Sequence, residues 1–141
     1  LQEPDVYAEM ISDSCATHVR ADMQKFIIHC KGVDKVILIT DSTMDEGTCP
    51  PELAHVPDIN FDEQGGVSGS KLTLDQACRN VMTHTTCGIT QAFLMASRNP
   101  ARAIGLEDEI GTIEVGKKAN LVIVDDRFTI KKVILEGEIF K

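Results

Sequence analysis

Residues 36–47 read VILITDSTMDEG, and this stretch decides the fold. Five apolar or β-branched residues, Val36 to Thr40, run directly into Asp41, and a polar turn that contains Gly47 follows. A short continuous apolar run is typical of a strand in a parallel sheet that is covered on both faces. In such sheets, catalytic groups sit at the carboxyl ends of strands. Asp41 occupies that place, and a turn or helix-capping aspartate that only ends the strand is the plain alternative.

The residues before this strand predict a second strand and a helix. Residues 6–11, VYAEMI, have the β-forming pattern, and residues 21–31, ADMQKFIIHCK, have the helical one, with Gly32 as a cap. The apolar face of the helix would comprise Met23, Phe26, Ile27 and Cys30. Strand, helix and strand form a βαβ unit. His18 follows the first strand, so we expect His18 and Asp41 at the same edge of the sheet, although a lone histidine is more often structural.

The middle of the chain alternates turns with helices. Residues 45–69 are rich in proline and glycine, and they predict a long irregular loop without core elements, of the kind that is functional or mobile. Within it, the small residues 65–70, GGVSGS, would let a ligand approach the backbone closely. Residues 73–76 match a capping box at the start of a helix. A second helix is predicted over residues 90–97, and the pair Asn99-Pro100 should stop it.

The pattern changes after Leu106. Three short β-rich runs follow, at residues 112–115, 120–124 and 132–135. They predict a small β unit appended to the α/β part, with a boundary near residues 107–109. The predicted division is therefore residues 1–106 and residues 107–141.

Composition narrows the class of protein. The 141 residues suit one domain or a large piece of one, and the opening at Leu1 looks like the interior of a longer polypeptide. The net charge of −8 leaves no basic face for nucleic acid, and no apolar run approaches the roughly 20 residues that span a bilayer. Nucleic acid and membrane are therefore not expected partners. Five cysteines without a CxxC pair predict reduced, mostly packed thiols in a cytoplasmic protein.

The other histidines are weaker candidates for function. His29 and His84 lie near helix ends, where packing or a helix-dipole role is usual, and His55 lies in the predicted loop. The sequence has no HxH, HExxH or paired-cysteine motif. No residue of this chain is therefore assigned as a metal ligand.

Three segments in fixed order carry a family resemblance. They read LITDSTMDEG at residues 38–47, GGVSGSKLTLDQACRNVM at 65–82 and AFLMASRNPARAIGLEDEIGTIEVGKKANLVIVDD at 92–126, with KKVILEGEIF behind them. Together they resemble the carboxyl-terminal part of N-acetylglucosamine-6-phosphate deacetylases of the amidohydrolase superfamily. The third segment is similar to many amidohydrolases. The pairing of a Thr-Asp strand end with the GS-x-LT-x-D-x-A-x-RN loop is more specific to the deacetylases.

The resemblance implies a fold and a set of site residues. The fold is α/β, the carboxyl-terminal part of a metal-dependent amidohydrolase (β/α)8 TIM barrel followed by strands of a small β-sandwich domain. A complete barrel takes roughly 250 residues. By resemblance, Asp41 is the catalytic aspartate, which takes a proton from the metal-bound water and delivers it to the departing amine. His18 resembles a substrate-binding histidine. The loop that lines the sugar pocket corresponds to Val67, Ser68, Gly69 and Ser70.

The resemblance also implies a cofactor and partners. A divalent metal, zinc first, would be bound mainly by residues outside this chain, so the isolated 141 residues are expected to be inactive. The substrate would be a small-molecule amino-sugar phosphate, and the full-length parent would be a homodimer. Two alternatives stay open at this point. One is another amidohydrolase that acts on a different amide or cyclic amide, such as a dihydroorotase-like protein. The other is a non-catalytic binding or assembly module.

Overall fold

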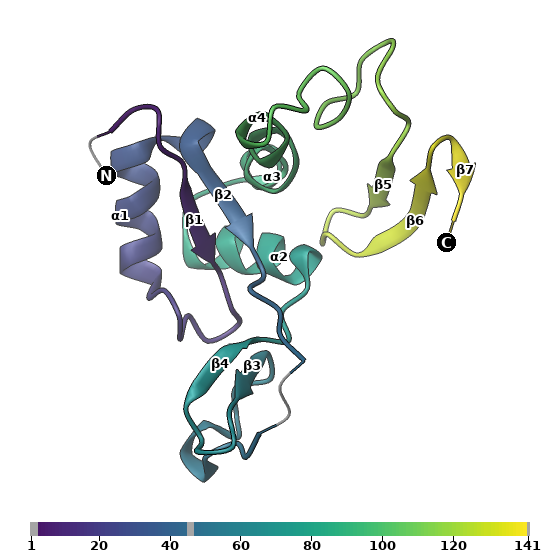
Figure 1. The fold of residues 1–141 in the computed structure, drawn as a ribbon. Coiled ribbons are helices and arrows are strands. Elements are labelled where there is room, and N and C mark those ends of the chain that lie inside the picture. Colours follow the sequence, from purple (N-terminus) through teal and green to yellow (C-terminus); the bar gives the residue numbers. More distant parts are fainter. Residues whose placement is uncertain (1–2, 45–46, 141) are drawn as a thin grey trace.

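The structure is a computed structural model that describes residues 3–44 and 47–140. Strand β1 (Ala8–Ile11) and strand β2 (Val36–Ile39) pair in parallel, with Ala8 opposite Val36 and Ile11 opposite Ile39. Helix α1 (Ala21–Lys31) and a short 3-10 turn (Val33–Lys35) connect them (Figure 1). The predicted βαβ unit is confirmed. The carboxyl ends of both strands point to the same edge, where the candidate site residues follow.

Helix α1 has the predicted bounds, but of its predicted apolar face only Ile27 packs against the core. Met23 and Phe26 are 48 % and 50 % exposed and Cys30 is exposed, whereas Gln24 is fully buried. The Gln24 amide donates to the Val19 carbonyl at 2.7 Å, and the Ser12 hydroxyl donates to the Gln24 side-chain oxygen at 2.9 Å. These polar contacts hold the face of α1 that carries Gln24 against the protein interior. The rotation of the helix therefore follows a buried hydrogen-bonded pair and not the apolar spacing alone.

A second set of helices extends the layer that α1 forms against the two strands, because α1 contacts α2 and both pack in one core cluster (Figure 1). It consists of α2 (Leu74–His84), α3 (Ile89–Phe93), a π-helical turn (Leu94–Arg98) and α4 (Asn99–Ala103). The main core lies between this layer and the strands. Its buried members are Met10, Val36, Leu38, Cys78, Val81, Ala92, Met95 and Phe128.

The predicted stop at Asn99-Pro100 is wrong, because the helix continues from Ile89 to Ala103 through the π turn. Proline has no N–H and its ring clashes with the carbonyl four residues earlier in a regular α-helix. The wider π turn, in which the Asn99 N–H donates to the Leu94 carbonyl, relieves that conflict. The Asn99 side chain is fully buried and donates to the carbonyls of Val33 and Val36, both at 2.7 Å. It anchors the helix at the start of β2.

Helix α2 begins after Thr73 as predicted, but the capping box does not form. The Gln76 side chain donates to Asn80 at 2.7 Å and accepts from Arg79, so it is not available to the backbone of Thr73. In the centre of the helix, Ala77, Cys78 and Val81 are buried.

The predicted irregular loop contains a β-hairpin. β3 (Ile59–Phe61) and β4 (Val67–Ser70) pair antiparallel, and Val56 joins Ile59 and Phe61 in a small apolar cluster of its own. The prediction of no core elements is therefore wrong. All three residues of β3 are buried, including the polar Asn60, and an alternation over only three residues is too short to indicate a strand. Figure 1 shows the hairpin beyond the carboxyl ends of β1 and β2.

The last third of the chain forms a three-stranded antiparallel sheet of β5 (Leu121–Val124), β6 (Ile130–Leu135) and β7 (Glu138–Ile139). Residues 112–115 were expected as a strand but form none, and Ile113 is 87 % exposed. Arg79 of α2 donates to the Phe128 carbonyl at 2.8 Å and so joins the helices to this sheet. The division at residues 106–107 stays a prediction. Within the described residues, no helix has the length and apolar character to span a membrane.

Candidate functional site

The carboxyl ends of β1 and β2 carry the two titratable groups that the sequence places there. Asp41 lies two residues beyond the end of β2, and His18 lies in the loop that follows β1. Because Ile11 and Ile39 are partners in a parallel pair, both segments leave the sheet at one edge. The geometry therefore agrees with the expected common edge for His18 and Asp41.

Asp41 has an unusual backbone and an unbound side chain. Its φ of 49° lies in the left-handed region, which few non-glycine residues adopt and in which aspartate is enriched. The residue is exposed, and no described residue donates a hydrogen bond to its carboxylate. The main chain is held, because the Ser70 N–H donates to the Asp41 carbonyl at 2.8 Å. A fixed backbone with a free carboxylate suits a group that moves protons.

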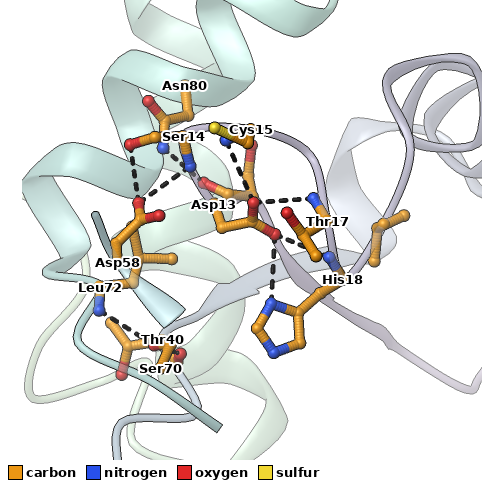
Figure 2. Close-up of polar contacts among 12 residues, drawn as sticks. Asp13, Ser14, Cys15, Thr17, His18, Thr40, Asp58, Ser70, Leu72 and Asn80 are labelled. Atoms are coloured by element: carbon orange, nitrogen blue, oxygen red, sulfur yellow. Dashed lines mark hydrogen bonds and ion pairs between the residues drawn. The ribbon is translucent and has the colours of Figure 1, made fainter. Parts of the chain in front are cut away.

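Asp13 is a site residue that the sequence reading did not identify. Its side chain is fully buried directly after β1, and it accepts backbone N–H bonds from Cys15 at 3.2 Å and from Thr17 and His18 at 2.8 Å each (Figure 2). Burial raises the pKa of this carboxyl, but the N–H groups of Thr17 and His18 and the His18 ring outweigh burial and bring the pKa below its usual value. Asp13 is therefore a carboxylate at neutral pH.

The Asp13 carboxylate orients the His18 ring. Nδ1 of His18 lies 3.1 Å from an Asp13 carboxylate oxygen. Figure 2 marks this contact with a dashed line. Since an ionised carboxylate only accepts, Nδ1 must carry the proton and Nε2 is the free position. Nε2 is buried and has no hydrogen-bond partner in the described residues. A buried ring nitrogen without a partner is suited to a polar group of a ligand.

The loop 67–70 lies beside Asp41 as β4 of the hairpin. Val67 is 51 % exposed, and the Ser68 carbonyl accepts from the Thr43 hydroxyl at 2.6 Å. Gly69 has a φ of 72°, and a Cβ there would stand 2.6 Å from the Asp41 carbonyl oxygen. Ser70 is fully buried. The structure thus brings Ser68, Gly69 and Ser70 against the segment from Asp41 to Thr43, whereas Val67 pairs with Phe61 farther along the hairpin.

Asp58 attaches the hairpin to the loop after β1. One of its carboxylate oxygens accepts from the Ser14 N–H at 2.8 Å and from the Ser14 hydroxyl at 2.7 Å (Figure 2). The other oxygen is buried and unpaired in the described residues. The two loops that carry His18 and residues 67–70 are therefore linked to each other. Residues 14 and 58 are far apart in sequence, so no local pattern could have revealed this contact.

The remaining histidines lie apart from this arrangement. His84 has its Nδ1 3.3 Å from the Gln24 amide nitrogen and 3.5 Å from the Ser12 hydroxyl, so it belongs to the polar contacts that hold α1. His29 borders a hollow of about 360 Å³ between α1 and the end of α2, and His55 is exposed. A larger hollow of about 630 Å³ lies between the helices and the β5–β6 strands, and none of the predicted site residues lines it.

The described residues do not by themselves form a metal centre. No group of three or more His, Cys, Asp or Glu side chains in residues 3–44 and 47–140 could hold a metal ion. Catalytic zinc takes three protein ligands and a water. The donor set in this part of the chain therefore does not fit a resident metal, and no residue is assigned to one.

Comparison with known proteins gives one consistent result. Residues 8–140 match the Amidohydrolase family. The N-acetylglucosamine-6-phosphate deacetylase of Vibrio furnissii is 32 % identical over 147 residues, covering 99 % of this chain and 36 % of that protein. The N-acetylgalactosamine-6-phosphate deacetylase of Escherichia coli O157:H7 is 27 % identical, covering 99 % and 38 %. This chain thus spans little more than a third of either relative.

A solved structure shows the same similarity. The crystal structure of N-acetylglucosamine-6-phosphate deacetylase from Pasteurella multocida superposes with a TM-score of 0.83 at 25 % identity, covering 98 % of this chain and 38 % of that one. The predicted fold is confirmed: the chain has the architecture of the carboxyl-terminal part of an amidohydrolase TIM barrel, followed by strands of the small β domain.

Proposed function

Because this chain belongs to the amidohydrolase family, we propose that it forms part of a deacetylase that hydrolyses the acetamide of N-acetylglucosamine 6-phosphate. The products would be glucosamine 6-phosphate and acetate. The observation that carries the proposal is Asp41 at the end of β2, whose carboxylate receives no hydrogen bond from residues 3–44 and 47–140 while its backbone is held by Ser70. The names of the relatives support the reaction class.

We propose that Asp41 is the proton carrier of the reaction. Amide hydrolysis needs a base that takes a proton from the attacking water and an acid that gives one to the departing amine. A single carboxylate can do both in turn, because it accepts a proton when ionised and can donate that proton afterwards. The same carboxylate would accept the water proton and then donate it to the nitrogen as the C–N bond breaks.

His18 and residues 67–69 are proposed as substrate contacts. The His18 Nε2 is buried and free in the described residues, so it can accept a hydrogen bond from a sugar hydroxyl or an amide N–H. Val67 and Gly69 lie on the strand next to Asp41, where a sugar would pass over the backbone. The divalent metal of the proposal, zinc first, would be held mainly by residues outside these 141 and would supply Lewis-acid chemistry.

The test is an acetate-release assay on the complete polypeptide that contains residues 1–141. Asp41→Asn removes the proton carrier but little volume, so turnover should fall by about 10²- to 10⁴-fold while substrate still binds. Asp126→Asn is the matched control, because Asp126 is an exposed aspartate in the turn between β5 and β6. Near-normal turnover in the Asp41 variant would refute its catalytic role.

The substrate sugar and the metal need separate measurements. The relatives include deacetylases named for the gluco and the galacto sugar, so both 6-phosphates should be assayed side by side. Removing metal with a chelator should abolish turnover, and restoring zinc should recover it.

The five cysteines, all described, form no disulfide, which supports the proposed cytoplasmic location. The proposed homodimer can be checked by light scattering.

A further inference from the structure

We propose that Ser70 is a positioning residue for Asp41, an inference that rests on the function proposed above. Ser70 is fully buried and makes two bonds to the end of β2. Its N–H donates to the Asp41 carbonyl at 2.8 Å, and its hydroxyl donates to the Thr40 carbonyl. The hydroxyl also accepts from the Leu72 N–H at 3.0 Å, so its hydrogen-bonding capacity is largely used inside the protein.

The two bonds fix the conformation of Asp41 because they hold the peptide planes on either side of its Cα. The Thr40 carbonyl belongs to the plane before Asp41, and the Asp41 carbonyl belongs to the plane after it. Holding both planes sets φ and ψ of the residue between them. The φ of 49° is one that a non-glycine residue rarely adopts without such constraint. Ser70 thereby determines the direction in which the Asp41 carboxylate leaves the strand end.

The hairpin supports Ser70 from behind. Asn60 of β3 is 1 % exposed, and its amide donates to the Ser70 carbonyl at 3.0 Å and to the Thr43 carbonyl at 2.8 Å. Gly69 allows the close approach, since a Cβ there would stand 2.6 Å from the Asp41 carbonyl oxygen and 2.5 Å from the Thr43 methyl. The position of Asp41 thus depends on a strand pair that lies 18 to 29 residues later in the sequence.

The direction of the Asp41 carboxylate affects the reaction rate through its distances to the reacting atoms. The proton carrier must reach the water oxygen and then the amine nitrogen, and a misplacement of about 1 Å in an active site can cost about 100-fold in rate. A sugar-binding role for Ser70 predicts a different result, because a lost ground-state contact raises KM and leaves kcat unchanged.

The experiment compares Ser70→Ala with Ser97→Ala in the complete polypeptide. Ser97 is an exposed serine whose hydroxyl donates to the Gly111 carbonyl at 3.3 Å, so its variant also loses one hydroxyl-to-carbonyl bond but far from Asp41. We expect kcat of Ser70→Ala to fall about 10- to 100-fold with KM within about threefold, and Ser97→Ala to behave as wild type. A rise in KM with unchanged kcat, or no change in either, overturns the proposal.

Hydrogen exchange gives a readout that does not depend on activity. The amides of residues 41–43 and 70 should exchange faster in Ser70→Ala than in Ser97→Ala, because the strand end is less constrained. Unchanged exchange refutes the positioning role. If wild type hydrolyses neither sugar phosphate, the proposed function fails, and the exchange result alone decides whether Ser70 fixes Asp41. If Ser70→Ala does not fold, Ser70→Cys serves instead, since a thiol of similar size is a weak donor and should lower kcat in the same way.

Discussion

Replacement of Asp13 by asparagine should destabilise the protein strongly. The Asp13 carboxylate accepts four hydrogen bonds in a fully buried position, from the N–H groups of Cys15, Thr17 and His18 and from the His18 ring. An asparagine oxygen can replace one carboxylate oxygen, but its NH₂ group must face two of these donors. Each buried donor left without an acceptor costs about 1–3 kcal/mol. The free energy of unfolding should therefore fall by about 2–6 kcal/mol.

The assay is urea unfolding followed by circular dichroism at pH 7, with the free energy obtained by linear extrapolation. Asp22→Asn is the control, because Asp22 is 69 % exposed and forms a surface ion pair with Arg20 at 2.8 Å. Exposed ion pairs contribute about 0–1 kcal/mol, so this variant should stay close to wild type. A loss in Asp13→Asn no larger than in Asp22→Asn would refute the reasoning.

The same comparison has a defined pH dependence. The folded-state pKa of Asp13 lies below its usual value, so the carboxylate contributes stability above the unfolded-state pKa of about 4. That contribution is lost as the pH falls through the lower, folded-state pKa. The stability gap between wild type and Asp13→Asn should therefore be full at pH 6–7 and should shrink below about pH 4. A gap that does not change between pH 7 and pH 3 would contradict the assignment.

Two further predictions concern glycines and thiols. Gly69→Ala and Gly105→Ala both place a side chain at a φ of 72°, but only at Gly69 would the new Cβ meet the backbone of Asp41, whereas at Gly105 it would meet nothing within 4 Å. Gly105→Ala should cost about 1 kcal/mol and Gly69→Ala at least twice that in urea unfolding, and equal losses would show that the close approach is unimportant. Burial raises the pKa of the Cys78 thiol to about 12, so at pH 8 a thiol reagent should modify it only on unfolding. The exposed thiols of Cys15, Cys30 and Cys49 should react quickly in the native protein, and rapid reaction of Cys78 in native buffer would contradict its burial.

The elements with a clear pattern in their own sequence, such as α1 and β2, were predicted correctly. The bounds of α1 followed from its helical composition and from Gly32, and β2 followed from a continuous apolar run. The rotation of α1 was not predictable, because it depends on Gln24 and its hydrogen bond with Ser12, the residue that follows β1. The hairpin was missed since its strand β3 is short and buries a polar residue. A buried asparagine looks like a loop residue until its partners are known.

The candidate site likewise contains some residues that the sequence predicted and others that it did not. Asp41 and His18 were expected at one edge because they follow strands, and the parallel pairing shows that both strands end at the same edge. Asp13, Asn60 and Asp58 were not identified, since each acts through bonds to atoms whose position only the folded chain defines. An aspartate directly after a strand and five residues before a histidine was the one available signal for Asp13.

The hairpin that supports Asp41 has its own small apolar cluster, separate from the main core, and is joined to the end of β1 and β2 by polar contacts through Asp58, Asn60 and Ser70. Segments built in this way can open as a cooperative unit without unfolding of the rest. Opening would release Asn60 and Ser70 together and leave the carboxylate of Asp41 undirected. The upper temperature at which the protein works would then be set by the melting of the hairpin and not by the unfolding of the helices and the main core.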